Sequence, residues 1–244
     1  MKESWFDIPT SDGVMNTYTA CPDEGGPFPT LLFYMDAFGL REELFDMVRR
    51  LASAGYFVAA PNLYYRRAKT FSAEQTPEGM ASLFEMMSHL SNAGATADTG
   101  ALLAWLRLQP DAVSTRVGAV GYCMSGPFVI AAAAAFPDRM ACVAAIHGAH
   151  LVTDQPDSPH RLARTLQCEV YLGCATHDKW AEPQAIAQLE DALKHSGAPH
   201  RVEWYEGTQH GFVFPQRRAA YDRAAAERHW SRLHALFSRN LVSA

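Results

Sequence analysis

Short segments of almost uninterrupted apolar character are the feature of this sequence that most restricts its fold. Residues 30–34 (Thr-Leu-Leu-Phe-Tyr) and 117–120 (Val-Gly-Ala-Val) lack the apolar and polar alternation of a strand with one wet face. Strands of this kind are typical of parallel sheets, in which helices cover both faces. The sequence therefore predicts the α/β class rather than an all-α or all-β protein.

Segments with helical periodicity lie between the apolar runs. Residues 41–54, for example, place Leu44, Val48 and Leu51 on one stripe with Arg and Glu residues opposite. We predict helices at 41–54, 96–108, 124–136, 182–196 and 216–239, and strands at 4–8, 14–20, 30–35, 56–60, 116–120, 141–146, 169–173 and 201–205. The first two strands flank a turn signal and are expected to form a hairpin. Right-handed crossovers would join the rest into an open, mostly parallel sheet of about eight strands.

The length of 244 residues suits one domain, because α/β folds often run to 200–250 residues. Hydrophobic residues make up 48% of the chain, which excludes a wholly disordered protein. We see no repeat or linker and predict a single domain over residues 1–244. Residues 61–95 and the loop 151–165 fit no clear pattern. The first of these segments follows a strand, so it either packs on the domain or forms part of a pocket wall.

Charge and apolar patterning exclude several classes of partner. Lys and Arg number 21 against 26 Asp and Glu, without a basic block, so a nucleic-acid partner is not expected. The longest apolar run, 128–136, is far shorter than the ~20 residues that span a bilayer. Acidic residues appear at the start of the chain before any apolar stretch of signal-peptide length. We therefore expect neither a signal peptide nor a membrane partner.

The five cysteines indicate a reducing compartment. They are odd in number and widely spaced, which does not fit the disulfide framework of a small secreted protein. They also lack zinc-site spacing, so no metal site is expected. We predict a cytoplasmic protein.

A nucleophile elbow is the sharpest chemical signal in the sequence. The strand at 116–120 leads through Gly121, Cys123, Ser125 and Gly126 directly into an Ala-rich helix. In a G-x-S-x-G elbow, a strained strand-to-helix turn exposes the nucleophile, and its neighbours must be small. Here Cys123 takes that place and Ser125 replaces the second glycine. The Met124 N–H would face a developing oxyanion. The alternative is an inert cysteine buried at a strand end.

A base and an orienting acid are expected downstream of the nucleophile, in the order nucleophile, acid, histidine. Asp178 follows the strand at 169–173, and His210 follows the strand at 201–205. His147 and His150 also follow a strand and are rival bases, whereas His229 and His234 are expected on the surface of the last helix. Asp178 could instead cap the helix at 182–196. The chain order favours a triad of Cys123, His210 and Asp178.

With these residues in place, the sequence resembles the dienelactone hydrolase family from residue 30 to the last helix. The resemblance rests on residues 121–126, 177–178, 210–212 and 34–39. It implies an α/β-hydrolase fold without a large lid and a Cys-His-Asp triad. It also implies a second oxyanion donor, the backbone N–H of Ala37.

Two departures from the family pattern affect the substrate. The family prototype has a glutamate beside the second donor, where this sequence has Asp36, and an arginine four residues after the histidine, where this sequence has Phe214. The second change favours a neutral or apolar ester over a small anion. Further candidate pocket residues are Phe38, Tyr64, Tyr65, Arg66 and Trp180.

The sequence therefore predicts a cofactor-independent hydrolase of a carboxylic ester or lactone that forms an acyl-enzyme. Acyl transfer, thioester cleavage or organophosphorus ester hydrolysis would use the same triad. A non-catalytic protein that senses a ligand or an oxidant through Cys123 is the alternative from another class. The expected partner is a small-molecule substrate, and the sequence leaves open a monomer or a small homo-oligomer.

Overall fold

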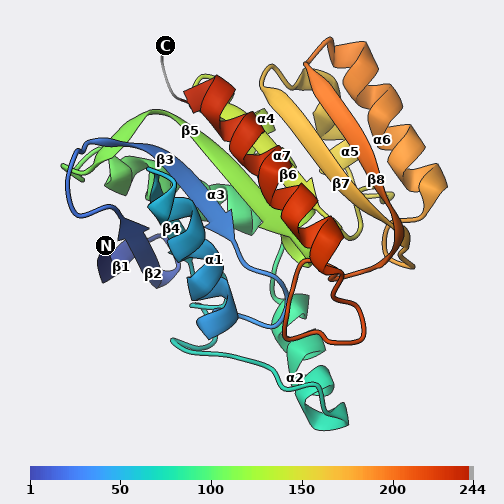
Figure 1. The fold of residues 1–244 in the computed structure, drawn as a ribbon, viewed down its shortest axis with the longest axis horizontal. Helices are drawn as coiled ribbons and strands as arrows, with labels where there is room; N and C mark the ends of the chain where they lie inside the picture. The colour runs from blue at the N-terminus through green and yellow to red at the C-terminus, as the bar shows by residue number, and fades with distance from the viewer. Residues whose placement is uncertain (242–244) are drawn as a thin grey trace. The chain divides into compact units, whose positions relative to one another are not determined.

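The computed structural model describes residues 1–241 and divides the chain into two compact units, Met1–Val117 and Gly118–Ala244. Strand β5 (Ala112–Tyr122) crosses the boundary between them. Each unit is an α/β structure (Figure 1).

The first unit begins with the predicted hairpin. Strands β1 (Lys2–Thr10) and β2 (Gly13–Cys21) pair antiparallel through a tight turn. Strands β3 (Phe28–Tyr34) and β4 (Phe57–Pro61) pair parallel, and β2 joins β4 antiparallel. The strand order is β1-β2-β4-β3, followed by the first part of β5. Strand β2 runs opposite to β1 and β4, because a two-residue turn reverses the chain.

Helices cover both faces of the first unit's strands. Helix α1 (Glu42–Ser53) packs on β2 and β4 with the predicted stripe of Leu44, Val48 and Leu51 buried, and α3 (Asn92–Leu106) contacts β1. In Figure 1, α1 lies in front of these strands and α3 behind them. The segment without a predicted structure contains α2 (Pro77–Ser88), of which only Leu83 is buried. A helix with so small a buried face has weak apolar periodicity, which explains why the pattern missed it.

The second unit contains the rest of β5 and three further strands: β6 (Met140–Ile146), β7 (Glu169–His177) and β8 (His200–Gln209). The pairs β6–β7 and β7–β8 are parallel. The helical segments are η1 (Cys123–Ser125), α4 (Gly126–Ala135), α5 (Pro159–Leu162), η2 (Ala163–Thr165), α6 (Pro183–Ser196) and α7 (Arg223–Leu241). Every residue of β6 is buried, as the continuous apolar pattern predicts.

Two helical layers cover the strands of the second unit. Helix α4 contacts β6 and α5, and α5 contacts α6, whereas α7 contacts β6 and β7. Figure 1 shows α7 crossing in front of these strands with α4 and α5 behind. The carboxyl ends of the parallel strands lead into the loops that carry the predicted triad, so the fold delivers those residues to one edge.

The predicted fold class is confirmed: the eight predicted strands are present, most pairs are parallel, and helices lie on both faces. Residues 1–241 contain no separate lid domain. The last helix was wrongly placed, because α7 begins at Arg223 and residues 211–222 form a loop and turns. The assignment of 1–244 to one domain stays a prediction.

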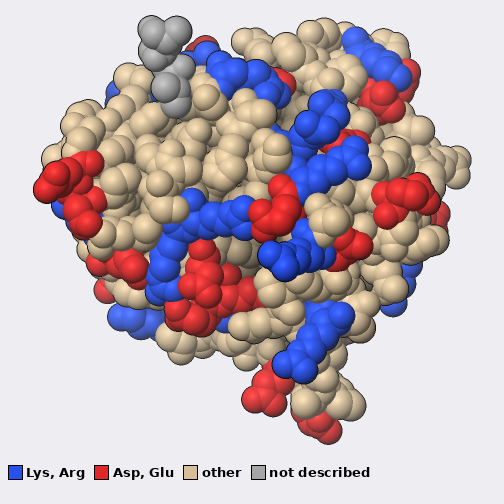
Figure 2. All heavy atoms as spheres, viewed as in Figure 1, with Lys and Arg blue, Asp and Glu red and all other residues tan. Residues whose placement is uncertain are grey.

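Two further features of the molecule are the charged side chains of its surface and the apolar character of its helices. Figure 2 shows Lys and Arg side chains beside Asp and Glu side chains across the face that it draws. Among residues 1–241, none of the helices combines the length and the apolar character that crossing a membrane requires.

Candidate active site

Cys123 occupies a strained turn between β5 and the helical segment that leads into α4. Its φ angle is +55°, in the left-handed region that few non-glycine residues adopt. Strain of this kind gathers at functional sites, where the surrounding structure holds it in place. Cys123 is partly exposed, whereas the other four cysteines are buried. The predicted elbow is therefore present in its geometry.

The glycines of the elbow are required by close backbone contacts. A Cβ on Gly121 would lie 2.3 Å from the carbonyl oxygen of Ser125 and 2.9 Å from a methyl carbon of Val129. A Cβ on Gly126 would lie 2.6 Å from the Cα of Gly148, in the loop after β6. Ser125 is fully buried at the position of the second glycine of the motif. The elbow thus tolerates a serine there but not a side chain at 121 or 126.

His210 and Asp178 lie in hydrogen-bond contact in the same unit as Cys123. The Nδ1 atom of His210 is 2.7 Å from Oδ2 of Asp178. The carboxylate is completely buried, and the imidazole is 15% exposed. Asp178 therefore fixes the ring orientation and the tautomer that directs Nε2 away from the carboxylate.

The pKa of His210 is set by its burial and by its neighbours Cys123 and Asp178. Burial alone would lower this pKa, but the negative charge of the Cys123 sulfur and the hydrogen bond to Asp178 raise it to about 9. The Nε2 atom is buried and makes no well-formed hydrogen bond to a described residue. Catalytic hydrogen bonds are often long before substrate binds.

Asp178 does not serve as a helix cap. Its Oδ1 atom accepts the backbone N–H of Trp180 at 2.9 Å, and the N-cap of α6 is Glu182. Both carboxylate oxygens are thus engaged, one by the backbone and one by His210. The Trp180 ring is 38% exposed and packs edge-on against the ring of His150.

The rival histidines of the loop after β6 do not contact Asp178 in this way. The His150 residue is exposed, and its N–H bonds to the Trp180 carbonyl. His147 is completely buried, and its ring lies edge-on to that of His210 with centroids 4.7 Å apart. The sequence pattern gave no sign of this contact, because it depends on two loops that meet only in the fold.

His229 is not on the surface, so that prediction was wrong. It is completely buried on α7, and its Nε2 lies 3.1 Å from the hydroxyl of Tyr122, the residue before Cys123. The arginines around it in the sequence suggested an exposed helix face. The buried positions of α7, which include His229, Trp230 and Leu233, lie between its arginines along the sequence, and a charge count does not resolve them.

Phe214 and Arg217 contact each other in the segment that follows His210. The Phe214 side chain is fully buried against Tyr122 and His147, which argues against direct contact with a substrate. Arg217 precedes α7 and lies in the loop after His210, with its guanidinium 4.7 Å from the centre of the Phe214 ring. The loop between His210 and α7 therefore contains a cation, the Arg217 guanidinium, although position 214 is aromatic.

The first unit contains the loop that the family resemblance assigns to the second oxyanion donor. Asp36 is completely buried and pairs with Arg41 at 2.6 Å, and its Oδ1 accepts the N–H of Phe38. The Tyr64 hydroxyl donates to the carbonyl oxygen of Ala37 at 2.8 Å. These contacts hold the backbone at Ala37 in one conformation.

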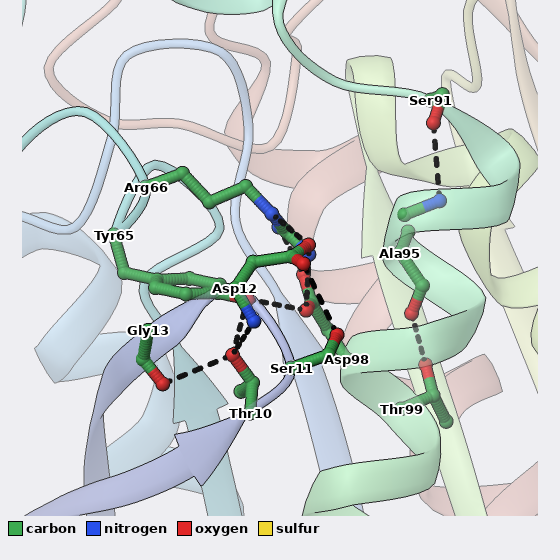
Figure 3. A network of polar contacts seen from close by, with 11 residues as sticks. Thr10, Ser11, Asp12, Gly13, Tyr65, Arg66, Ser91, Ala95, Asp98 and Thr99 are labelled. Carbon is green, nitrogen blue, oxygen red and sulfur yellow. Dashed lines mark hydrogen bonds and ion pairs between the residues drawn. The ribbon is translucent and has the colours of Figure 1, made fainter.

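Two other candidate pocket residues of the first unit belong to a polar network (Figure 3). The Arg66 guanidinium bonds both oxygens of Asp98 at 2.8 Å and also pairs with Asp12. The Tyr65 hydroxyl donates to Asp98, and its pKa is raised to about 12 by burial and by that carboxylate. The charge of Arg66 is thus already balanced within its own unit.

Comparison with known proteins supports the same family. Residues 15–241 match the model of the dienelactone hydrolase family. The chain is 28% identical over 244 residues to a "Putative carboxymethylenebutenolidase" from Synechocystis sp., covering 99% of this chain and 98% of the relative. It is 31% identical to a protein of the same name from Methylorubrum extorquens, with 94% and 78% covered.

A solved structure agrees in fold. A crystal structure of a "Putative Dienelactone Hydrolase" from Klebsiella pneumoniae has a TM-score of 0.86 and 25% identity, with 98% of both chains covered. A crystal structure of dienelactone hydrolase from Anabaena variabilis has a TM-score of 0.71 at 16% identity and shares the fold over 98% of each chain. The chain belongs to the dienelactone hydrolase family and is a hydrolase.

Proposed function

We propose that this hydrolase cleaves a carboxylic ester or lactone through a triad of Cys123, His210 and Asp178. The observation that carries the proposal is the 2.7 Å contact between His210 and Asp178 beside a cysteine on a strained elbow. The three residues follow β5, β7 and β8, in the order expected of an α/β-hydrolase.

Acylation begins with the thiolate of Cys123, which attacks the carbonyl carbon of the substrate. The negative charge moves to the carbonyl oxygen, where the N–H of Met124 stabilises it in the first helical turn after the elbow. The Ala37 N–H is proposed as the second donor. His210 transfers its proton to the leaving alkoxide as the C–O bond breaks. A thioester on Cys123 and a neutral His210 result.

Deacylation uses water and restores the starting state. Neutral His210 takes a proton from water, and the oxygen attacks the thioester carbonyl. The C–S bond breaks, the acid product leaves, and Cys123 returns as a thiolate beside the protonated histidine. Asp178 holds the ring in one tautomer throughout and stabilises the imidazolium, without accepting the proton itself.

Substrate selection is proposed to involve Trp180. The sequence candidates of the first unit, Phe38, Tyr64, Tyr65 and Arg66, with Asp36 as an auxiliary group, stay predictions, since the hydrogen bonds described above for Tyr64, Tyr65 and Arg66 lie within that unit. Trp180 lies two residues after Asp178 and is 38% exposed, which suits contact with an apolar acyl or alcohol group. Arg217 lies in the loop after His210. Because a guanidinium can pair with a carboxylate, a carboxylated lactone is also a candidate substrate. A screen of esters and lactones of graded size and charge separates these classes.

The test is the turnover of p-nitrophenyl acetate by Cys123→Ala beside a matched Cys21→Ala control. Cys21 is buried at the end of β2, and burial raises its pKa, so its loss is expected to leave turnover unchanged. C123A should keep its circular dichroism spectrum and lose turnover. Unchanged activity in C123A would overturn the proposal.

The alternatives are distinguished by product and acceptor. A transferase predicts that added alcohols or amines capture the acyl group faster than water does, and a thioesterase or organophosphorus hydrolase predicts preference for those substrates. A sensor predicts no turnover of any activated ester together with ready oxidation of Cys123. We propose the cytoplasm as the setting and a small molecule as the partner, since the five cysteines, all within the described residues, are not joined in disulfides.

A further inference from the structure

The unpaired buried polar atoms of this protein gather in one place. Among residues 1–241, the buried side-chain nitrogen and oxygen atoms without a hydrogen-bond partner are Nδ1 and Nε2 of His147 and Nε2 of His210. The two rings are in edge-to-face contact, with centroids 4.7 Å apart. The proposed mechanism accounts for the atom on His210, which faces the nucleophile. It leaves both nitrogens of His147 without a function.

His147 lies in a wall of aromatic side chains behind the catalytic histidine. Its ring contacts those of Tyr122, Phe212 and Phe214 and has no exposure to solvent. Burial lowers its pKa well below the usual value, and the nearby positive charges of His210, Arg217 and His229 act in the same direction. His147 is therefore a neutral imidazole at neutral pH.

Packing alone does not explain a histidine at this position. An imidazole with both nitrogens unpaired in the core is less favourable than a hydrocarbon side chain of similar size. The φ angle of 37° favours residues such as asparagine and histidine over bulkier apolar ones, but it does not require a ring. The remaining distinctive property of His147 is its polarity at the face of His210.

The backbone fixes His147 relative to the elbow. Its N–H bonds the Gly173 carbonyl of β7 at 2.7 Å, and the Ala149 N–H bonds the carbonyl oxygen of Cys123 at 2.9 Å. Between these two contacts, Gly148 packs directly on Gly126. The loop that carries His147 is thus attached to the strand before Asp178 and to the nucleophile itself.

We propose that His147 is a positioning residue, whose neutral imidazole gives the His210 ring a polar neighbour on its buried side and so stabilises its protonated form. An aliphatic side chain at position 147, packed among the rings of Tyr122, Phe212 and Phe214, would put an apolar surface against His210 and disfavour a charged imidazolium. This inference rests on the proposed function, because the protonated His210 is the partner of the Cys123 thiolate and the proton donor to the leaving group.

The test compares His147→Leu with His147→Asn, two side chains of nearly equal shape that differ in polarity. The readouts are the pH at which His210 loses its proton, followed by NMR, and the pH profile of Cys123 alkylation, mapped by mass spectrometry. We expect H147L to lower the His210 midpoint by about one pH unit and kcat/KM by about tenfold. H147N should keep the midpoint near that of the wild type.

His229→Leu is the matched control, because it removes another buried imidazole of the same aromatic cluster, one whose ring contacts those of Tyr122 and Trp230. It is expected to lower stability through loss of the Tyr122 hydrogen bond and to leave the His210 midpoint in place. A merely structural role for His147 predicts lower stability in H147L without any change of midpoint.

The inference is overturned if H147L keeps the wild-type midpoint, or if H147L and H147N shift it equally. If H147L does not fold, His147→Phe takes its place in the comparison with H147N, since it retains a ring and removes the polarity. Failure of the proposed function is recognised separately, because C123A would then still turn over p-nitrophenyl acetate.

Discussion

The Nδ1 atom of His210 lies 2.7 Å from Oδ2 of Asp178, while the other oxygen of that carboxylate accepts the backbone N–H of Trp180. The carboxylate is therefore held by the backbone of its own loop, independently of the histidine. This rigid acceptor defines which nitrogen of His210 faces Cys123 and stabilises the imidazolium.

Asp178→Asn should leave the fold intact and lower kcat by roughly a thousandfold, because an amide can support the wrong histidine tautomer and lacks the negative charge. Steady-state kinetics on purified D178N measure the effect. Retention of the Trp180 hydrogen bond keeps the loop in place, so an unfolded variant is not expected. A loss of less than tenfold would contradict the orienting role.

The pH dependence of activity should follow the proton on His210. Its pKa of about 9 means that the proton is present at neutral pH and is lost as the pH rises through that value. Hydrolysis of alkyl esters, whose leaving groups need a proton, should fall above pH 9. Hydrolysis of p-nitrophenyl esters should fall less, because p-nitrophenolate leaves without one. Equal profiles for the two ester classes would contradict the acid role.

Stability should change in the same pH range. The folded pKa of His210 lies above the usual value of 6.5, so the folded state holds this proton more tightly than the unfolded chain. Its contribution is fully present below pH 6.5 and is lost as the pH rises through about 9. Urea unfolding of the wild type and of His210→Phe across this range measures it. The difference in unfolding free energy between the two should shrink toward alkaline pH.

Gly121→Ala should disrupt the elbow, because the added methyl would lie 2.3 Å from the carbonyl oxygen of Ser125. We expect a loss of about 1–3 kcal/mol of stability and a large fall in kcat/KM. Gly197→Ala is the control: its φ is +73°, but no atom lies within 4 Å of the added methyl. It should lower stability through backbone strain and leave kcat/KM unchanged. Wild-type activity in G121A would be inconsistent with the elbow geometry.

Trp180→Ala tests the proposed substrate contact. The change removes the ring but keeps the N–H that holds Asp178, so kcat should change little. We expect KM for aromatic esters to rise roughly three- to tenfold. Trp5→Ala removes an exposed ring of β1 and serves as the control. An unchanged KM in W180A would place the substrate elsewhere.

The strands and the order of the candidate triad could be predicted because both follow from local pattern. Continuous apolar runs indicate buried strands, and in such a sheet Cys123, Asp178 and His210 each follow a strand end. The glycine spacing at Gly121 describes a turn made by adjacent residues, which sequence alone can express.

The surroundings of the triad could not be predicted, because they depend on contacts between distant segments. His147 and His210 are 63 positions apart in the sequence and meet through the loops after β6 and β8. His229 was wrongly predicted on the surface, because its helix is rich in arginine although part of that helix is buried. Residues 77–88 form a helix in which only Leu83 is buried. Its sequence therefore lacks the apolar periodicity by which a helix is predicted.

Trapping of the acyl-enzyme shows whether Cys123 is the nucleophile. The wild-type protein is mixed with p-nitrophenyl acetate in stopped flow, quenched with acid, and examined by intact-mass measurement and peptide mapping. We expect a burst of about one equivalent of p-nitrophenolate and a single acetyl group on Cys123. The proposed nucleophile would be contradicted if the wild type turned over the ester with neither a burst nor an acetyl label on Cys123, and if C123A kept the same turnover.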